Sequence, residues 1–197
     1  MKKSILLPII TILVCAAILF GTAVGLNGIA AENAQAAHLE LMRTLLPGSE
    51  NFTLEPYAGE DANIVSVHKA DNGYVIETVT YGYADEITMY IGVNNDGRVT
   101  GLVVYEAHET FGLGNNALTD HEFLAQFLNE TGSFTVATHG ADAFSSASGE
   151  VEEDTAIEVD GITGATVTSK AVARCVTSAV AYVTGADASS SATTWGG

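Results

Sequence analysis

A short turn near the C-terminus, Asp160-Gly161-Ile162-Thr163-Gly164-Ala165-Thr166, carries residue types suited to holding a phosphate group. An amphipathic helix follows it, because apolar residues recur at helical spacing at Val172, Cys175, Val176, Ala179, Val180 and Val183. We expect this helix to begin close to Thr168. The amide groups of its first turn and the positive end of its dipole would then face an anion at or near Thr166. Gly164 and Ala165 allow close approach, and Lys170 adds a positive charge.

The same seven residues match, position for position, the flavin-attachment motif Asp-x-x-(Ser/Thr)-Gly-Ala-Thr. In proteins that carry this motif, a flavin transferase uses FAD to esterify the last threonine with FMN. The resemblance implies that Thr166 carries FMN through a phosphoester bond. Without its context, a Thr-Gly-Ala-Thr string is also typical of an ordinary helix N-cap. The preceding Asp160 and the following helix favour the attachment motif.

A second segment, His108-Glu109-Thr110-Phe111-Gly112-Leu113-Gly114, follows a strand-like run. It resembles the His-x-Glu-Thr-Pro-Gly-Leu-Gly loop found in the G subunit of the Rnf electron-transport complex and in the C subunit of the sodium-pumping NADH:quinone reductase. Phe111 stands where proline is usual, so the loop lacks a residue that would fix φ. In the family this loop lies beside the isoalloxazine ring. The resemblance implies a cofactor-binding set of Thr166, Asp160, Thr163, Gly164, Ala165, Thr168, Lys170, Glu109, Thr110, Gly112, Leu113 and Gly114.

The N-terminal region predicts a membrane anchor over residues 5–30. Residues 4–31 carry no formal charge, and about 20 apolar residues are enough to span a bilayer. Lys2 and Lys3 precede this run and Glu32 follows it, so the positive-inside rule places residues 1–4 in the cytoplasm and the rest of the chain outside. A cleaved signal peptide is the alternative, but its apolar core usually has only about 7–15 residues. We expect an uncleaved single-pass anchor in the cell membrane.

The charge of the chain excludes nucleic acid as a partner. All 24 acidic residues but only five of the seven basic ones lie after residue 31, and such a surface repels polyanions. Negative surroundings should also lower the reduction potential of a flavin. Cys15, in the anchor, and Cys175 cannot pair, and no cysteine cluster suits iron–sulfur or zinc ligation. We expect no metal site and no catalytic group beyond the flavin.

Along the chain, the patterns predict an α+β fold: an N-terminal transmembrane helix plus one small FMN-binding domain, residues 49–185, with an antiparallel sheet and flanking helices. The turns Asp71-Asn72-Gly73 and Asn94-Asn95-Asp96-Gly97 indicate two hairpins. In the second hairpin, alternation along the strand predicts that one face is shared by Val99, Gly101, Val103 and Tyr105. The other expected elements are a stalk helix over 31–48, a capping box at Thr119–Glu122 opening a helix to about Asn129, an exposed loop over 140–155, a short strand at Glu158-Val159 and a disordered tail over 186–197.

The resemblance implies that the chain acts in electron transfer as one subunit of a larger complex. In the family, covalent FMN relays electrons inside an Rnf-type complex that couples ferredoxin:NAD electron transfer to Na⁺ or H⁺ translocation. The expected partners are the other subunits of that complex and a flavin transferase. The chain lacks a nucleotide-binding Gly-rich motif and iron–sulfur ligands, so the flavin supplies the redox chemistry and the protein attachment, orientation and electrostatics. A component similar to the C subunit of the sodium pump, or a stand-alone extracytoplasmic FMN-binding or sensory module, is the alternative.

Overall fold

The computed structural model describes residues 32–137 and 156–186, together with positions 12, 15, 16, 20 and 30. The chain divides into two compact units, Met1–Leu41 and Met42–Gly197. Most of the predicted anchor and all of the predicted 140–155 loop lie outside the described residues, as does the tail from residue 187. Among the residues that are described, no helix has both the length and the apolar character needed to cross a membrane.

A helix occupies the position of the predicted stalk, but it is shorter than expected. In the first unit, residues 32–41 are helical, and the last helical turn, residues 42–45, opens the second unit. The sequence pattern predicted that Pro47-Gly48 would end the helix. Helical structure ends at residue 45, two positions before Pro47, because a residue that precedes proline is disfavoured in the helical conformation. Gly48 then adopts a φ of +87°.

The second unit is built on a five-stranded antiparallel sheet in the order β1-β2-β3-β4-β5. The strands are β1 (Thr53–Glu55), β2 (Ile64–Ala70), β3 (Gly73–Tyr81), β4 (Glu86–Asn94) and β5 (Val99–Ala107). Both predicted hairpins are confirmed: Ala70 pairs with Gly73 across the first turn, and Gly97 takes a φ of +78° in the second. Glycine tolerates this left-handed conformation at little cost.

One sequence prediction for the sheet is wrong. Simple alternation placed Val99, Gly101, Val103 and Tyr105 on one face, but the register of β5 against β4 shifts between Gly92 and Val93 and again between Thr88 and Met89. Each bulge inserts one residue and reverses the side to which the following side chains point. As a result, Leu102 and Val104 pack against the core with Val99, and Tyr105 is exposed.

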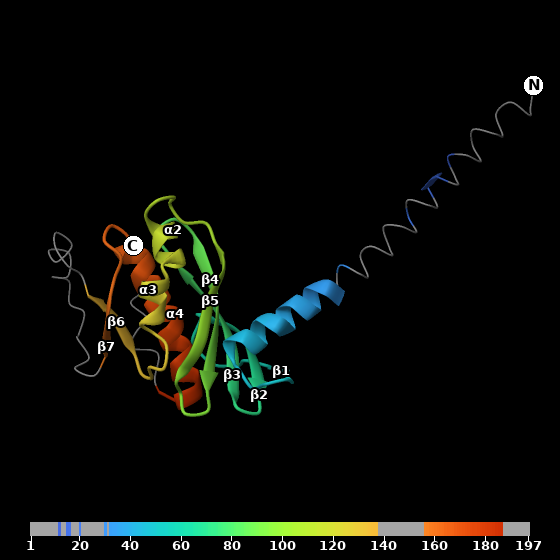
Figure 1. Ribbon diagram of the computed structural model, residues 1–197, viewed down its shortest axis with the longest axis horizontal. Coiled ribbons are helices and arrows are strands. Elements are labelled where there is room, and N and C mark those ends of the chain that lie inside the picture. The colour runs from blue at the N-terminus through green and yellow to red at the C-terminus, as the bar shows by residue number, and fades with distance from the viewer. Residues whose placement is uncertain are drawn as a thin grey trace, which may run out of the picture. The chain divides into compact units, whose positions relative to one another are not determined.

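In the described part of this unit, helices and a second, two-stranded sheet accompany the first sheet (Figure 1). The remaining elements are α2 (Gly114–Thr119), α3 (His121–Ala125), β6 (Phe134–Ala137), β7 (Ile157–Asp160) and α4 (Thr166–Thr184). The predicted strand at Glu158-Val159 is confirmed as part of β7, which pairs in parallel with β6, a strand that the sequence patterns did not indicate.

The predicted capping box at Thr119–Glu122 is replaced by a different cap. Asp120 is the N-cap of α3, and its Oδ1 atom accepts hydrogen bonds from the amides of Glu122 and Phe123, both at 2.9 Å. The Thr119 hydroxyl instead donates to the carbonyl of Asn115 in α2, at 3.0 Å. A carboxylate one residue later thus satisfies the first-turn amides of the helix. Helix α3 also ends at Ala125, before the expected boundary near Asn129.

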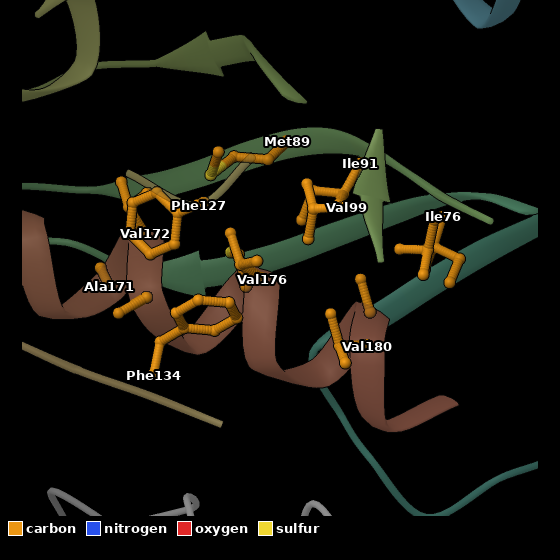
Figure 2. Packing of buried hydrophobic residues seen from close by; sticks show 14 of the residues in the cluster. Ile76, Met89, Ile91, Val99, Phe127, Phe134, Ala171, Val172, Val176 and Val180 are labelled. Carbon is orange, nitrogen blue, oxygen red and sulfur yellow. The ribbon is translucent and has the colours of Figure 1, made fainter. Parts of the chain in front are cut away.

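The core forms where α4 crosses the sheet. Helix α4 contacts β3 and β4 on one side and β6 on the other, so it lies between the two sheets (Figure 1). Figure 2 shows Val172, Val176 and Val180 of α4 facing Ile91 and neighbouring sheet residues. These side chains are at most 1% exposed. The apolar stripe predicted for this helix is therefore confirmed, and it fixes the helix N-terminus at one end of the sheet.

Candidate functional site

The turn that carries the attachment motif begins where β7 ends. The amide of Asp160 donates to Gln126 Oε1 at 2.7 Å, and Gln126 Nε2 donates to the Asp160 carbonyl at 3.1 Å. This paired contact holds the backbone of β7 to the end of α3. The Asp160 side chain is exposed. Gln126, which the sequence patterns did not indicate, therefore fixes the entry into the turn.

The turn itself is compact. The Ala165 amide donates to the Ile162 carbonyl at 2.9 Å, and the Ile162 amide donates to the Ser169 hydroxyl at 3.2 Å. Gly164 sits between them with a φ of +81°, a conformation that L side chains rarely adopt. Thr163 and Gly164 are exposed and Ala165 is buried.

Helix α4 begins at Thr166, two residues earlier than the expected start near Thr168. Ala165 is its N-cap, and the Ser169 amide makes the first helical bond, to the Ala165 carbonyl, at 2.9 Å. The left-handed turn at Gly164 accounts for the early start, because it brings the chain into helical conformation directly after Ala165. Thr166 is therefore the first residue of the helix and is half-buried, at the end where the dipole and the first-turn amides favour an anion.

Charged groups of both signs lie near this helix end. The first turn of α4 contains no acidic residue of its own, but the Glu109 carboxylate lies 3.1 Å from the Thr168 hydroxyl in that turn. Lys170 lies one helical turn after Thr166, on the same side of the helix, since residues four apart are neighbours on a helix surface. Arg174 follows one turn later, and its guanidinium donates to the Tyr81 carbonyl at 3.2 Å.

The second motif forms a loop between β5 and α2. The Thr110 carbonyl accepts the amides of Leu113 at 3.3 Å and Asn115 at 3.2 Å. Gly112 adopts a φ of +80°, and its carbonyl accepts the Asn116 side-chain amide at 2.8 Å. The loop thus makes a defined turn with Phe111, which is 92% exposed, in the position where the resembling loops carry proline.

The fold brings the two motifs together at two points. The Leu113 Cδ2 atom lies 3.3 Å from the position that a Cβ on Gly164 would occupy. The Thr168 hydroxyl donates to Glu109 Oε2 at 3.1 Å. Glu109 Oε1 accepts two further hydrogen bonds, from the amides of Tyr83 at 2.8 Å and Ala84 at 3.2 Å. The turn at residues 82–84, the loop at 109–114 and the start of α4 therefore lie next to one another.

The residues predicted to bind the cofactor differ in how they face solvent. Six of them are exposed: Asp160, Thr163, Gly164, Thr110, Gly112 and Leu113. Thr166, Lys170 and Glu109 are half-buried, and Ala165, Thr168 and Gly114 are buried. The Thr168 and Glu109 side chains are turned toward each other. The sequence patterns missed Tyr83, Ala84, Gln126 and Ser169, whose contacts are backbone-mediated or depend on tertiary structure.

The residues present fit an FMN group esterified to Thr166. A Cβ at Gly112 would meet no atom within 4 Å, so the loop leaves open space beside the turn. Leu113 is 49% exposed and Val167 46% exposed, and such side chains suit the apolar face of a flat ring. A helix start with a nearby lysine suits the phosphate. The open turn and the exposed apolar groups thus suit the two ends of the same cofactor.

Other parts of the second unit show no comparable arrangement of the predicted site residues. A hollow of about 410 Å³ beside β1 and β2 is lined by Leu54, Glu55, Pro56, Tyr57, Val65 and Ser66, none of which belongs to the predicted set. Within residues 32–137 and 156–186, no cluster of three or more His, Cys, Asp or Glu side chains could hold a metal ion. Cys175 is completely buried, and burial raises the pKa of its thiol to about 12.

Comparison with known proteins identifies a family that matches this chain. Residues 82–181 match the family described as "FMN-binding domain". The G subunit of the ion-translocating oxidoreductase complex of Methanosarcina acetivorans is 32% identical over 156 residues, which cover 73% of each chain.

Two further relatives match over a shorter range. The G subunit of the proton-translocating ferredoxin:NAD⁺ oxidoreductase complex of Clostridium ljungdahlii is 33% identical, over 56% of this chain and 53% of the relative. The G subunit of the Na⁺-translocating ferredoxin:NAD⁺ oxidoreductase complex of Acetobacterium woodii is 32% identical, over 51% and 44%. The matches with these two relatives thus span about half of their length.

Among solved structures, Shewanella oneidensis NqrC matches with a TM-score of 0.43 and 21% sequence identity, over 69% of this chain and 65% of that one. The family match spans both motifs, the Glu109–Gly114 loop and the Asp160–Thr166 turn. The match with the Methanosarcina acetivorans protein extends over most of both chains. The chain therefore belongs to the FMN-binding domain family and, within it, to the relatives of the G subunits of ion-translocating oxidoreductase complexes.

Proposed function

We propose that this chain is the membrane-anchored G subunit of an Rnf-type complex and that it relays electrons through FMN bound covalently to Thr166. The observation that carries the proposal is the position of Thr166, the first residue of α4, directly after the left-handed turn at Gly164. An ester formed there would place its phosphate at the positive end of a 19-residue helix.

Attachment requires a bond between Thr166 Oγ1 and a phosphorus atom. A flavin transferase would supply FAD, the threonine oxygen would displace AMP from the FMN phosphorus, and the hydroxyl proton would be released. The chain contributes the position of the hydroxyl, while Lys170 and the first-turn amides of α4 stabilise the added negative charge.

The attached flavin supplies reversible electron transfer. The chain's own residues orient it and set its surroundings. Leu113 and Val167 offer an apolar contact, and Gly112 leaves room for close approach. The acidic composition of the domain, with 24 Asp and Glu residues in the chain, favours the oxidised flavin and lowers its potential.

The surrounding complex supplies the rest of the reaction. The relatives from Clostridium ljungdahlii and Acetobacterium woodii are subunits of ferredoxin:NAD⁺ oxidoreductases that move H⁺ and Na⁺ respectively. By the same logic, this protein passes electrons between partner subunits during ferredoxin:NAD electron transfer coupled to movement of one of these ions. Residues 5–30 anchor it in the cell membrane, with residues 1–4 in the cytoplasm and the flavin domain outside.

The attachment is tested by substituting Thr166 in cells that also produce the flavin transferase. We expect Thr166→Ala to abolish flavin fluorescence of the full-length chain in a denaturing gel, and Thr166→Ser to retain part of it. Thr177→Ala is a matched control, since Thr177 lies on the same helix and its hydroxyl accepts the Phe134 amide at 3.0 Å, away from the turn. A fluorescent Thr166→Ala band would show that the flavin is attached elsewhere.

The place in a larger complex is tested separately. Membranes that contain wild-type complex should reduce NAD⁺ with reduced ferredoxin, and membranes with Thr166→Ala should lose this activity while the other subunits still co-purify. Reporters active only outside the cytoplasm should work when fused after Gly197. Full activity without the flavin on this chain would remove it from the electron path.

A further inference from the structure

We propose that Glu109 is a positioning residue: its carboxylate holds the first turn of α4, and therefore Thr166, in place for flavin attachment. The resemblance to known loops suggests direct contact with the cofactor, but the structure directs both carboxylate oxygens to groups of the protein. Oε1 accepts the amides of Tyr83 and Ala84 at 2.8 and 3.2 Å, and Oε2 accepts the Thr168 hydroxyl at 3.1 Å. Charge-assisted hydrogen bonds of this kind are among the stronger ones in proteins.

Two glycines make room for this carboxylate. A Cβ at Gly82 would overlap Glu109 Oε1, and a Cβ at Gly114 would overlap Oε2. Gly82 precedes the two amides that Oε1 accepts, and Gly114 is the first residue of α2. The seat for the carboxylate is therefore built from the β3–β4 turn on one side and the start of α2 on the other, and any larger residue at either glycine would displace it.

The third side of the seat is Thr168, which is completely buried. Its hydroxyl lies in the first turn of α4, two residues after Thr166. The ends of a helix fray more readily than its middle, because their amides lack partners within the helix. The Glu109 carboxylate is held by two backbone amides, and the Thr168 hydroxyl donates to it. This hydrogen bond opposes fraying of the first turn of α4, where the Thr166 hydroxyl must be accessible for attachment.

The test compares two buried threonines of the same helix. Thr168 is 0% exposed and donates to Glu109, whereas Thr177 is 5% exposed and its hydroxyl accepts the Phe134 amide. Thr168→Val and Thr177→Val each remove one buried hydroxyl, so both should lower the thermal midpoint of the full-length chain. Only Thr168→Val should slow attachment by purified flavin transferase and FAD, by about tenfold for a lost hydrogen bond to a charged group. Equal attachment rates for the two variants would overturn the proposal.

A conservative substitution at Glu109 distinguishes a positioning role from a general loss of stability. Glutamine at position 109 keeps an oxygen for the Tyr83 and Ala84 amides, and its NH₂ group can donate to the Thr168 hydroxyl oxygen. We expect Glu109→Gln to retain attachment close to the wild-type rate and Glu109→Ala to lose it. Glu109→Asp, one methylene shorter, cannot reach both sides of the seat and should resemble Glu109→Ala. A Glu109→Gln variant as slow as Glu109→Ala would contradict the positioning role.

A readout without flavin distinguishes this inference from the proposed function on which it rests. In a Thr166→Ala background, Glu109→Ala should speed amide hydrogen exchange of Tyr83 and Ala84, and also that of Ser169, whose amide closes the first turn of α4 on the Ala165 carbonyl. Thr177→Val should leave these three amides protected. If the wild-type chain accepts no flavin but this exchange pattern appears, the proposed attachment is wrong and the link from Glu109 to α4 stands. If attachment occurs and the exchange of Tyr83 and Ala84 is unchanged by Glu109→Ala, the positioning role is wrong.

Discussion

Leu113 and Gly164 are in contact distance: the Leu113 Cδ2 atom lies 3.3 Å from the place where a Cβ on Gly164 would be. They belong to the two motifs that resemblance to known flavoproteins singles out, and 51 positions of sequence separate them. This proximity supports the proposal that the two motifs form one site. A left-handed glycine lets the attachment turn approach the apolar residue of the other loop without a side chain between them.

This contact predicts that Gly164→Ala slows flavin attachment. An alanine would be strained at a φ of +81°, at a cost of about 1–2 kcal/mol, and its methyl would press on Leu113. Gly185→Ala is the control, because Gly185 caps the other end of α4 at a φ of +70° with no atom within 4 Å of a Cβ. Both variants should lose similar stability, measured as the thermal midpoint, and only Gly164→Ala should lose attachment rate. Equal rates would mean that the Leu113 contact has no role.

The loop around Gly112 gives a second prediction. A Cβ at position 112 meets no atom within 4 Å, so the main cost of Gly112→Val to the protein itself is the strain at a φ of +80°. The valine would instead occupy the open space beside the turn. We expect covalent FMN at wild-type stoichiometry with a shifted absorption spectrum and midpoint potential.

Gly132→Val controls for this experiment, because Gly132 also has a positive φ, of +124°, with open space around it, and lies outside both motifs. It should leave the flavin spectrum unchanged. If Gly112→Val also left the spectrum and potential unchanged, the loop would not lie beside the flavin ring.

Local patterns were sufficient to predict much of this fold. Each hairpin depends on a short turn with glycine, and α4 on an apolar stripe that recurs every three or four residues, so their signals lie within a few positions of sequence. The turn that precedes α4 was predictable for the same reason. Only the start of α4 differs from the prediction: the helix begins at Thr166 and not near Thr168, because the left-handed Gly164 starts it early.

Features that depend on distant residues were not predictable. Strand β6 has four residues, and its partner β7 lies about twenty positions later, with no local signal for a parallel pair. The hydrogen bond from Thr168 to Glu109 joins positions 59 apart, and neither residue type nor spacing indicates it. The bulges in β5 depend on how two strands pair, so alternation along one strand could not reveal which side chains enter the core.

Cys175 provides a prediction that concerns the core. Its thiol is fully buried, and burial raises its pKa from 9.0 to about 12. In a Cys15→Ser background, a thiol reagent at pH 8 should label the full-length chain only after denaturation. Because the folded-state pKa is raised, the protonated thiol contributes stability below about pH 9, and this contribution is lost as the pH rises from 9 toward 12. Cys175→Ser should flatten that part of the stability profile, and rapid labelling of the native chain would contradict the burial.

The last prediction concerns the packing of Leu45, the last helical residue before Pro47, against the sheet. Gly92 of β4 faces Leu45, and a Cβ there would overlap the Leu45 carbonyl oxygen. The same carbonyl accepts the Thr100 hydroxyl at 2.6 Å. Gly92→Ala should therefore push Leu45 away from the sheet and destabilise the folded chain by about 1–3 kcal/mol, as overpacking does. Thr100→Val should cost about 1 kcal/mol, the usual net value of one hydrogen bond.

The two changes should also be coupled. If Gly92→Ala displaces the Leu45 carbonyl, the hydrogen bond from Thr100 is already broken in that variant, and adding Thr100→Val should cost little more. Chemical denaturation of the full-length chain in detergent, followed by near-UV circular dichroism, measures the four free energies of the cycle. Strictly additive losses would show that the Leu45 carbonyl does not move, and that the sheet accommodates a methyl at position 92 in some other way.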